Sequence, residues 1–418
     1  MRLVHIFSPF EEICVLFDSA ERPLEFSVWK EDELQTEAIY SAQAVCQVPS
    51  GWFLDLGKGK TAYINMPSVY LKPDGKLCRS PLTQGDRLLV QIIRPEIREK
   101  EAEASHKIGL AGKNVVLMPT QQAPSFSRQL DQEKKERLLS SFPQEGVLFR
   151  TLAGKTDVRD IRKEVEFLKQ KWSDILSKAE KNGELYTPQK DVFRYASSYS
   201  TDLKEIVTND AKTAAALKAS GLPVTFEGRG LWNKERLDEA LDEIKATKTL
   251  LPSGGFLMTE QTSACVCFDV NAGAGKASTA NEEACSEILR QIRLKGLGGQ
   301  MVVDFAGRKD ENTMKRLIGG LKRDNVFISG VSTLGLVELT VKKTRASVFD
   351  VFSCPEKRQA ARIILKLWDA VSVSKPVVSA SPVVLSYVRP FLKQLEQRLG
   401  TQTELCFSQT EKVEGTVD

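Results

Sequence analysis

The chain has 418 residues, of which 41% are hydrophobic and 27% are charged, and its formal net charge is +4. This length favours two to four domains, and the composition is that of a soluble globular protein. No apolar run reaches the roughly 18 residues of a membrane span, and the apolar part of the N-terminus is too short for a signal peptide, so we expect a cytoplasmic protein. The net charge is too small to indicate a nucleic-acid partner by itself.

Strands dominate the first 118 residues. Residues 1–36 alternate apolar and polar side chains, which predicts a β meander. Residues 37–118 contain five short apolar runs separated by Gly and Pro turns, a pattern typical of a small barrel of the OB type.

The predicted barrel carries aromatic and basic residues near one another. Phe53 and Tyr63 are either core residues or a surface on which bases stack, and the pattern alone leaves both readings open. Lys60 and Lys100 are placed to attract phosphate groups.

Residues 119–180 begin with a polar link and continue with a charged helix, a strand and a long amphipathic helix. Arg150 and Thr151 lie between the strand and the long helix, where a guanidinium and a hydroxyl group can bind a terminal phosphate. The alternative is that Arg150 pairs with a nearby carboxylate. Residues 181–250 are mixed, with an amphipathic helix expected over 232–249 and no recognisable chemistry.

The stretch 251–304 carries the strongest chemical signal. Two apolar, β-branched runs end in the carboxylates Asp269 and Asp304, and a helix-compatible segment separates them, which predicts a βαβ-like unit. Both carboxylates would then lie at the same edge of one sheet, with Asn271 on the same face as Asp269. Mg²⁺ prefers such oxygen ligands. The alternative is that each Asp is a helix N-cap or part of an Asx-turn.

Basic residues gather around and after this stretch. They are Arg293, Lys295, Lys342, Lys343 and Arg345. Such a run is either a solvated face or a surface that meets phosphates. Residues 351–418 predict two helices and a strand.

Familiar nucleotide-binding loops are absent from the sequence. The run Gly57-Lys-Gly-Lys-Thr61 lacks the leading Gly of a Walker A loop, and Gly273-Ala-Gly-Lys fails in the same way. The run Gly296-Leu-Gly-Gly precedes a strand instead of following one, so it is no dinucleotide fingerprint. With two His and no Cys-x-x-Cys pair, a zinc site based on these residues is disfavoured. Cys265 and Cys267 are expected to be small buried thiols.

A series of motifs in residues 251–345 resembles the catalytic core of the ribonuclease E/G family. In order they are Leu251-Pro-Ser-Gly-Gly, Glu260-Gln-Thr, Asp269-Val-Asn-Ala-Gly, Asn281-Glu-Glu-Ala, Glu287-Ile-Leu-Arg-Gln-Ile-Arg293, Leu297-Gly-Gly, Val303-Asp-Phe305 and Ser332-Thr-Leu-Gly335 with Lys342-Lys-Thr-Arg345. A weaker likeness covers nearly the whole chain. The chain is more similar to the short, ribonuclease G-like members than to the long ribonuclease E.

The resemblance implies an α+β multidomain fold. It consists of a ribonuclease H-like subdomain with an inserted S1-type OB barrel and a 5′-sensor region, followed by an α/β DNase I-like catalytic domain and a small C-terminal domain. The expected boundaries are 1–36 plus 181–245 for the ribonuclease H-like subdomain, 37–118 for the barrel, 119–180 for the sensor region, 246–350 for the catalytic domain and 351–418 for the C-terminal domain.

The resemblance also implies a Mg²⁺-dependent endoribonuclease of RNA processing or decay. Asp269 and Asp304 would hold one Mg²⁺, Asn271 would orient them or contact the phosphate, and single-stranded RNA would be cut to 5′-phosphate and 3′-hydroxyl ends. The residues implied in RNA binding are Phe53, Tyr63, Lys60, Lys100, Arg293, Lys295, Lys342, Lys343 and Arg345. Those implied in sensing a 5′-monophosphate are Arg128, Arg150 and Thr151.

Two motifs depart from the family pattern. The loop Pro124-Ser-Phe-Ser-Arg128 lacks the Gly-Gly found in many members, and Lys357 stands where the second Cys of the zinc link belongs after Cys354, so no structural zinc is expected there. A homo-oligomer is left open. The rival functions are an RNA-binding protein of the same fold without strong catalysis, and a metal-dependent phosphodiesterase acting on a small substrate.

Overall fold

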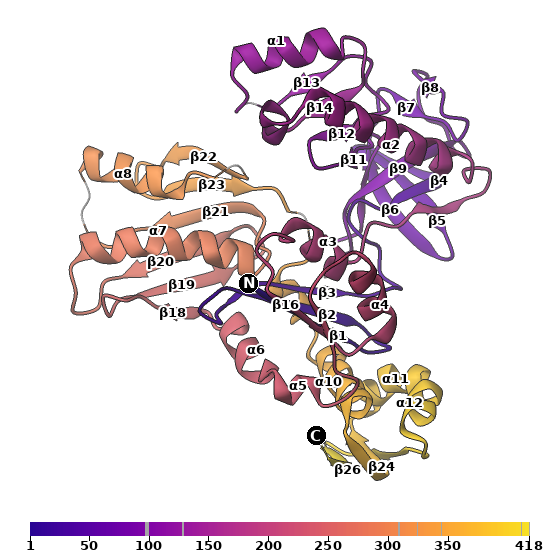
Figure 1. Ribbon diagram of the computed structural model, residues 1–418, viewed down its shortest axis with the longest axis vertical. Coiled ribbons are helices and arrows are strands. Elements are labelled where there is room, and N and C mark those ends of the chain that lie inside the picture. Colours follow the sequence, from indigo (N-terminus) through magenta and orange to yellow (C-terminus); the bar gives the residue numbers. More distant parts are fainter. Residues whose placement is uncertain are drawn as a thin grey trace. The chain divides into compact units, whose positions relative to one another are not determined.

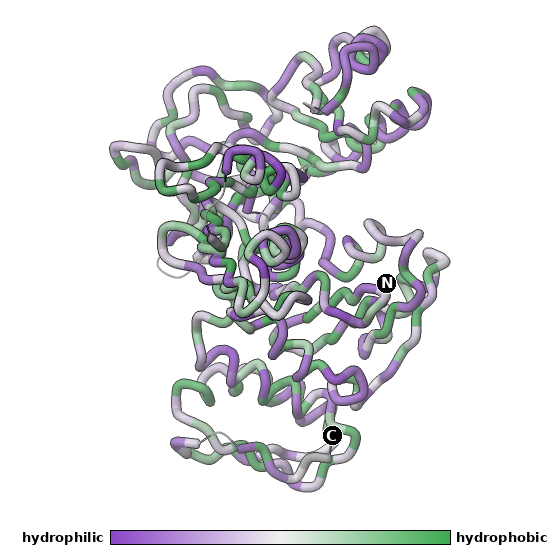
Figure 2. The backbone as a smooth tube through the Cα atoms, turned by 90° about the vertical axis from the view of Figure 1, so that its left-hand side faces the viewer, coloured by the Kyte–Doolittle hydropathy of each residue, from purple (hydrophilic) through white to green (hydrophobic). Residues whose placement is uncertain are grey.

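The computed structural model describes residues 1–96, 100–127, 129–307, 310–323, 325–343, 345–410 and 412–417 (Figure 1). The chain forms two compact units: unit 1 comprises Met1–Asp32 and Gln189–Asp418, and unit 2 comprises Glu33–Pro188. The second segment of unit 1 begins at Gln189. Hydrophobic and hydrophilic stretches interleave along the backbone (Figure 2). Among the described residues, none of the helices has the length and apolar character needed to cross a membrane.

Unit 2 is built on a closed five-stranded barrel. Its strands are β4 (Ile39–Val48), β5 (Gly51–Gly57), β6 (Lys60–Asn65), β9 (Arg87–Arg94) and β10 (Glu103–Ser105). The strands follow the order β4-β5-β6-β10-β9, and a pairing between β4 and β9 closes the barrel. The arrangement is consistent with the OB-like barrel predicted from the sequence. Short strands extend the sheet: β7 (Tyr70–Leu71), β8 (Leu77–Cys78) and β15 (Gly183–Tyr186).

The remainder of unit 2 is a small four-stranded sheet with helices. The strands lie in the order β11 (Leu110–Ala111), β12 (Val115–Leu117), β14 (Val147–Phe149) and β13 (Ser125–Phe126). The helices are α1 (Gln132–Ser141), η1 (Thr151–Lys155) and α2 (Val158–Leu176). Helix α2 buries Ile161, Val165, Leu168 and Ile175, which recur at helical spacing and pack into the same core as the sheet.

The first sheet of unit 1 contains strands from both segments of the unit, which flank unit 2 in the sequence. Its order is β17 (Val224–Phe226), β16 (Glu205–Thr208), β1 (Arg2–Phe7), β2 (Glu12–Phe17) and β3 (Pro23–Trp29). The meander β1-β2-β3 is antiparallel, whereas β1 pairs with β16 in parallel. Helices on both faces cover this sheet: α3 (Asp191–Ser198) and α4 (Ala211–Ala219) on one, and α5 (Leu231–Lys234) and α6 (Leu237–Lys245) on the other.

One helix prediction in this region is wrong. The helix expected over 232–249 is divided into α5 and α6, because Arg236 adopts a left-handed conformation with φ 51°. The last residues of the expected helix, together with Leu250, form the short edge strand β18 (Lys248–Leu250) instead.

The second sheet of unit 1 has six strands. Their order is β18, β19 (Phe256–Gln261), β20 (Val266–Asn271), β21 (Gly299–Asp304), β23 (Val337–Val341) and β22 (Val326–Val331). Strands β20 and β21 are parallel and joined by α7 (Ala277–Leu294), the predicted βαβ unit. Helices α7 and α8 (Glu311–Leu321) lie on one face of the sheet (Figure 1).

Alternation along the strands defines the opposite face, which we call the open face. Val266, Phe268 and Val270 are buried against the helices, so Cys267, Asp269 and Asn271 project to the other side. The open face carries exposed or half-exposed side chains only. From β18 to β22 they are Lys248, Leu250, Phe256, Met258, Glu260, Cys267, Asp269, Asn271, Gln300, Val302, Asp304, Glu338, Thr340 and Phe327.

The C-terminal part of unit 1 contains the remaining elements. They are α9 (Val348–Val351), α10 (Pro355–Asp369), β24 (Ser372–Ala380), α11 (Pro382–Val388), η2 (Arg389–Phe391), α12 (Leu392–Leu399), β25 (Glu404–Phe407) and β26 (Lys412–Val417). The strands form a small sheet in the order β25-β24-β26. Cys354 is the N-cap residue of α10, and its sulfur lies 3.7 Å from a carboxylate oxygen of Glu356.

Candidate active site

Asp269 and Asp304 are neighbours across the parallel pair of β20 and β21. They are register partners, although 35 positions separate them along the chain, and both are exposed on the open face. Adjacent strands lie about 4.8 Å apart, so two such side chains stand side by side. The helices that follow these strands have their own N-caps, Lys276 for α7 and Asp310 for α8, so neither Asp serves as a helix cap.

Asn271 ends β20 on the same face as Asp269. Its Oδ1 accepts a hydrogen bond from the backbone N–H of Gly273 at 2.9 Å, which is the Asx-turn considered as an alternative for this region. The turn orients the amide. A contact from Asn271 to a phosphate would therefore come from its Nδ2 group.

The turn Leu251–Gly255 holds the end of β20 from the other side. A Cβ on Gly255 would lie 2.5 Å from the carbonyl oxygen of Asn271, so only glycine permits this approach. The N–H and hydroxyl of Ser253 donate to Oε2 of Glu283 on α7 at 3.0 and 2.7 Å. These contacts connect the turn, the strand end and the helix.

Asn281 on α7 positions the segment that follows Asp304. Its Nδ2 donates to the carbonyl oxygen of Ala306 at 3.0 Å, and its Oδ1 accepts from the N–H of the same residue at 2.8 Å. The side chain is only 2% exposed. Sequence analysis identified Asn281 as part of a motif but gave it no role, because the partner is a backbone group that no pattern reveals.

The donor set limits which metal the site can hold. Among the described residues, no three His, Cys, Asp or Glu side chains come together in a way that could hold a metal ion. Zinc sites use at least three protein ligands. Mg²⁺ keeps several waters and is often bound by one or two carboxylates, so the pair Asp269 and Asp304 fits its chemistry.

Most of the basic residues predicted to contact RNA have partners within unit 1. The Arg345 guanidinium donates to the hydroxyl of Tyr195 and to the carbonyl oxygen of Arg293. Arg293 donates to Glu25 at 2.6 Å. Lys343 lies 2.8 Å from Asp350; burial opposes ionisation of Asp350, but hydrogen bonds from Lys343 and Ser347 outweigh it and hold the pKa of that carboxyl below its ordinary value.

Lys295 and Lys342 differ most in accessibility. Lys295 is 1% exposed and donates to the carbonyl oxygen of Ala246, and burial lowers its pKa to about 8, helped by nearby Arg290. The ammonium group is thus enclosed in this structure, and a contact between Lys295 and RNA stays a prediction. Lys342, just beyond β23, is exposed.

Cys265 and Cys267 also depart from expectation. They are half-buried and not fully buried, and their sulfurs lie 3.8 Å apart. Cys267 stands on the open face beside Asp269 along β20. Burial and the adjacent Cys265 raise the pKa of Cys267 above its ordinary value, which keeps it in the thiol form at neutral pH.

On the barrel, Phe53 and Tyr63 are register partners on β5 and β6. Their rings meet edge to face with centroids 5.9 Å apart, and both side chains are half-exposed. The core of the barrel is formed by neighbours such as Trp52, Leu54 and Ile64. The two aromatics thus lie on the outer surface, where Lys60 is half-exposed and Lys100 fully exposed.

The predicted sensor residues lie at the start of η1. The Arg150 guanidinium is exposed and donates to the carbonyl oxygen of Gly112 at 2.8 Å. The Thr151 hydroxyl lies 2.9 Å from that of Ser127. Arg128, the third predicted member, lies outside the described residues.

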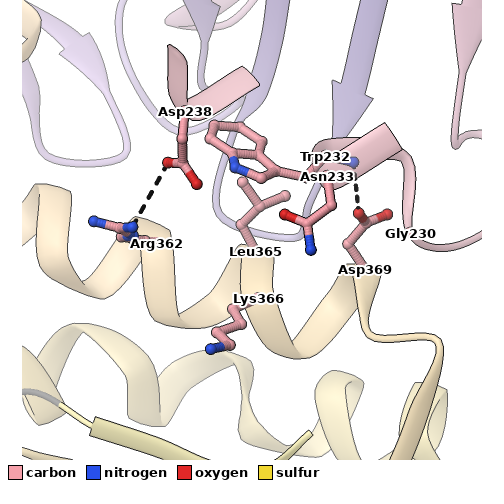
Figure 3. A pocket seen from close by; sticks show the side chains of 8 residues that line it. All are labelled: Gly230, Trp232, Asn233, Asp238, Arg362, Leu365, Lys366 and Asp369. Carbon is pink, nitrogen blue, oxygen red and sulfur yellow. Dashed lines mark hydrogen bonds and ion pairs between the residues drawn. The ribbon is translucent and has the colours of Figure 1, made fainter. Parts of the chain in front are cut away.

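A cavity of about 100 Å³ that the sequence gave no sign of lies between α5 and α10 (Figure 3). Asp369 lines it, is 5% exposed and accepts from the N–H of Trp232 at 2.8 Å. Burial raises the pKa of Asp369 above its ordinary value. An ion pair between Asp238 and Arg362 spans 3.6 Å at the side of the cavity. None of the predicted site residues lines it.

Comparison with known proteins now adds an independent observation. Residues 109–344 match the Ribonuclease E/G family. The chain is 24% identical to "Ribonuclease G" of Haemophilus influenzae over 84% of this chain and 85% of that protein, and 26% identical to "Ribonuclease G" of Escherichia coli over 72% of each. It is 25% identical to "Ribonuclease E" of Synechocystis over 66% of this chain and 47% of that longer protein. With the match spanning more than half of its residues, the chain belongs to the ribonuclease E/G family.

Proposed function

We propose that the protein is a metal-dependent endoribonuclease that hydrolyses single-stranded RNA to 5′-phosphate and 3′-hydroxyl ends. The observation that carries this proposal is the register pairing of Asp269 with Asp304 on an uncovered sheet face. The relatives are named as ribonucleases, which supports the same class of substrate.

The carboxylates of Asp269 and Asp304 would hold one Mg²⁺. When bound, this ion polarises a phosphate and lowers the pKa of a coordinated water. Asn271 would contact the substrate phosphate through Nδ2, with its orientation fixed by the turn to Gly273. Asn281 bonds the segment that follows β21, and Glu283 bonds the turn that lies against the end of β20, so both would keep the strand ends in place.

The barrel would bind the RNA strand. Stacking of one base on an exposed aromatic ring is worth about 1–3 kcal/mol, and it requires an unpaired base. Phe53 and Tyr63 provide such rings, and Lys60 and Lys100 provide cations for the backbone. Single-stranded RNA is therefore the proposed substrate.

The finer domain assignments belong to the same proposal. The five-stranded sheet of unit 1 would be the ribonuclease H-like subdomain, the six-stranded sheet with α7 and α8 the DNase I-like catalytic domain, and the barrel an S1-type domain. Arg150 and Thr151, with Arg128, would contact a 5′-monophosphate. Assembly through a shared thiolate zinc site is not part of the proposal, since Lys357 replaces the second Cys.

Cleavage of a short A/U-rich single-stranded RNA with and without Mg²⁺ tests the proposal. The wild type should cut only with the metal, and Asp304→Asn should lower kcat at least about 100-fold, because one of two metal ligands loses its charge. Glu338→Gln is the matched control, since it neutralises another exposed carboxylate of the open face. Its activity should stay within about twofold of the wild type.

Other outcomes would redirect the proposal. An equal loss in Glu338→Gln would show that the two aspartates are not special. A wild type that binds the RNA but leaves it intact under all conditions would favour the RNA-binding protein without catalysis. Cleavage of a dinucleotide as fast as of the longer strand would favour a phosphodiesterase of small substrates.

A further inference from the structure

We propose that Phe256 and Lys248 form a nucleotide subsite beside the carboxylate pair, in which Phe256 stacks one base of the RNA and Lys248 binds an adjoining phosphate. This inference rests on the proposed ribonuclease function and deepens it. It assigns a role in RNA binding to two side chains of unit 1 that the sequence analysis left without one.

Register places these residues next to the candidate catalytic residues. Asp304, Asp269, Met258 and Lys248 form one row across β21, β20, β19 and β18. Asn271, Phe256 and Leu250 form the neighbouring row. Strand spacing sets Phe256 about 5 Å from Asn271 and Lys248 about 10 Å from Asp269, measured between backbones. A strand of RNA with its phosphate at the aspartates can therefore reach both side chains.

The two side chains have the chemistry that single-stranded nucleic acid requires. The ammonium group of Lys248 lies 4.1 Å from the ring centroid of Phe256, and Leu250 is 75% exposed beside it. An aromatic ring, an apolar neighbour and a cation on one surface provide a stacking platform and a phosphate ligand. The ring of Phe256 is half-exposed and does not belong to the core beneath the sheet, where Leu257 and Phe268 lie.

The contact between Lys248 and Phe256 does not prevent this use. A cation over a ring at an exposed site is a weaker interaction than a stacked base. A base can therefore displace the ammonium from the ring, and the lysine, which is long and exposed, then turns toward the negative phosphate.

Short RNAs with one abasic nucleotide at successive positions around the cleavage point test the subsite. Phe256→Leu keeps an apolar side chain and removes the stacking surface, so KM should rise about tenfold while kcat changes less than about threefold. In the wild type, one abasic position should raise KM to a similar extent. In Phe256→Leu, the same position should have no further effect, because the base and the ring act together.

Two further variants of the subsite and one control variant complete this test. Phe256→Tyr should bind like the wild type, and Lys248→Gln should weaken binding and reduce its dependence on salt. Phe327→Leu is the matched control, since Phe327 is 60% exposed on the same face but on the far edge strand β22. Its KM should not change. An equal rise in Phe327→Leu, or equal sensitivity of the wild type and Phe256→Leu at every abasic position, would overturn the subsite.

A binding measurement separates this inference from the proposed function. In Asp304→Asn, RNAs that carry 2-aminopurine at successive positions should include one that loses fluorescence on binding, and Phe256→Leu in the same background should abolish that loss. If the wild type fails to cleave RNA, the proposed function fails, yet this quenching still decides the subsite. Unchanged quenching in Phe256→Leu would reject the subsite even if cleavage is robust.

Discussion

Burial changes the pKa of some side chains in this protein, and charged or hydrogen-bonding neighbours change the pKa of others. Lys295 is an example of burial. Its place in the sequence predicts a contact with phosphate, whereas its ammonium group is enclosed in unit 1. Spacing in a sequence shows where a cation lies along the chain. It does not show whether that cation faces water, because the answer depends on segments far away.

Lys295 should make stability depend on alkaline pH. Its pKa falls from 10.5 when unfolded to about 8 in the folded chain, so the unfolded state binds more protons between these values. The free energy of unfolding should therefore rise with pH across this window, by at most about 3 kcal/mol. Chemical denaturation at several pH values between 7.5 and 9.5 measures the rise.

Lys295→Met is the control for that titration. Methionine keeps much of the aliphatic length and removes the charge, so the rise should disappear in the variant. A wild-type profile that stays parallel to that of Lys295→Met across the whole range would contradict the assignment.

Asn281 offers a second prediction at this scale. Asn281→Ala removes two hydrogen bonds and leaves the N–H and carbonyl of the half-buried Ala306 without them, which should cost about 1–3 kcal/mol of stability. It should also lower kcat, because the segment after Asp304 loses its support. Thermal unfolding together with steady-state cleavage measures both, and a normal kcat in a destabilised variant would show that Asn281 is structural only.

Among the helices and strands, the βαβ unit could be predicted from the sequence, but strand β18 and the break between α5 and α6 could not. The two apolar runs ending in Asp269 and Asp304 predict parallel strands with adjacent ends, and β20 and β21 confirm this. The strand β18 and the break at Arg236 were missed, since a three-residue edge strand has no periodicity and an Arg with positive φ carries no signal. Strand β18 forms by pairing with β19.

Gly255 provides the prediction at the scale of elements. In Gly255→Ala the new Cβ meets the carbonyl oxygen of Asn271, so the turn and the end of β20 must move apart. We expect a loss of about 1–3 kcal/mol in stability and at least about tenfold in kcat. Both follow from one backbone contact.

A second glycine supplies the control. A Cβ on Gly319 in α8 meets nothing within 4 Å, so Gly319→Ala should stabilise the helix by about 0.5–1 kcal/mol and leave kcat unchanged. Parallel thermal melts and cleavage assays compare the two variants. If both variants were equally active, the close approach at Gly255 would not position the site.

For the whole molecule, the sequence predicted two kinds of architecture that the structure contains, a closed barrel and mixed α/β sheets. The proposed separation of RNA binding by unit 2 from catalysis by unit 1 gives a prediction for the whole molecule. Phe53→Leu should raise KM for single-stranded RNA about tenfold and leave kcat within about threefold, because in the proposed function the barrel supplies a stacking surface and no catalytic group. The thermal midpoint should not change, since the ring is half-exposed. A fall in kcat at saturating RNA would contradict this division.

Sequence could not predict where unit 1 resumes after unit 2. The sequence gives no sign that residues 183–186 form β15, which pairs with β4 of the barrel. The pairing of β15 with β4 keeps residues 183–186 in unit 2, and unit 1 resumes at Gln189.

The parallel pairing of β1 with β16 has a consequence for how the protein is made on the ribosome. Leu3 lies beside Ile206, so β1 has to wait for a partner synthesised about 200 residues later. Unit 2 is an unbroken segment and is complete by Pro188, so it can fold before the edge of β1 that faces β16 is paired. Until β16 is synthesised, the meander β1-β2-β3 has an unpaired edge, and its strand β2 is apolar. We therefore expect this part of the nascent polypeptide to be the most exposed to misassociation and to chaperone binding.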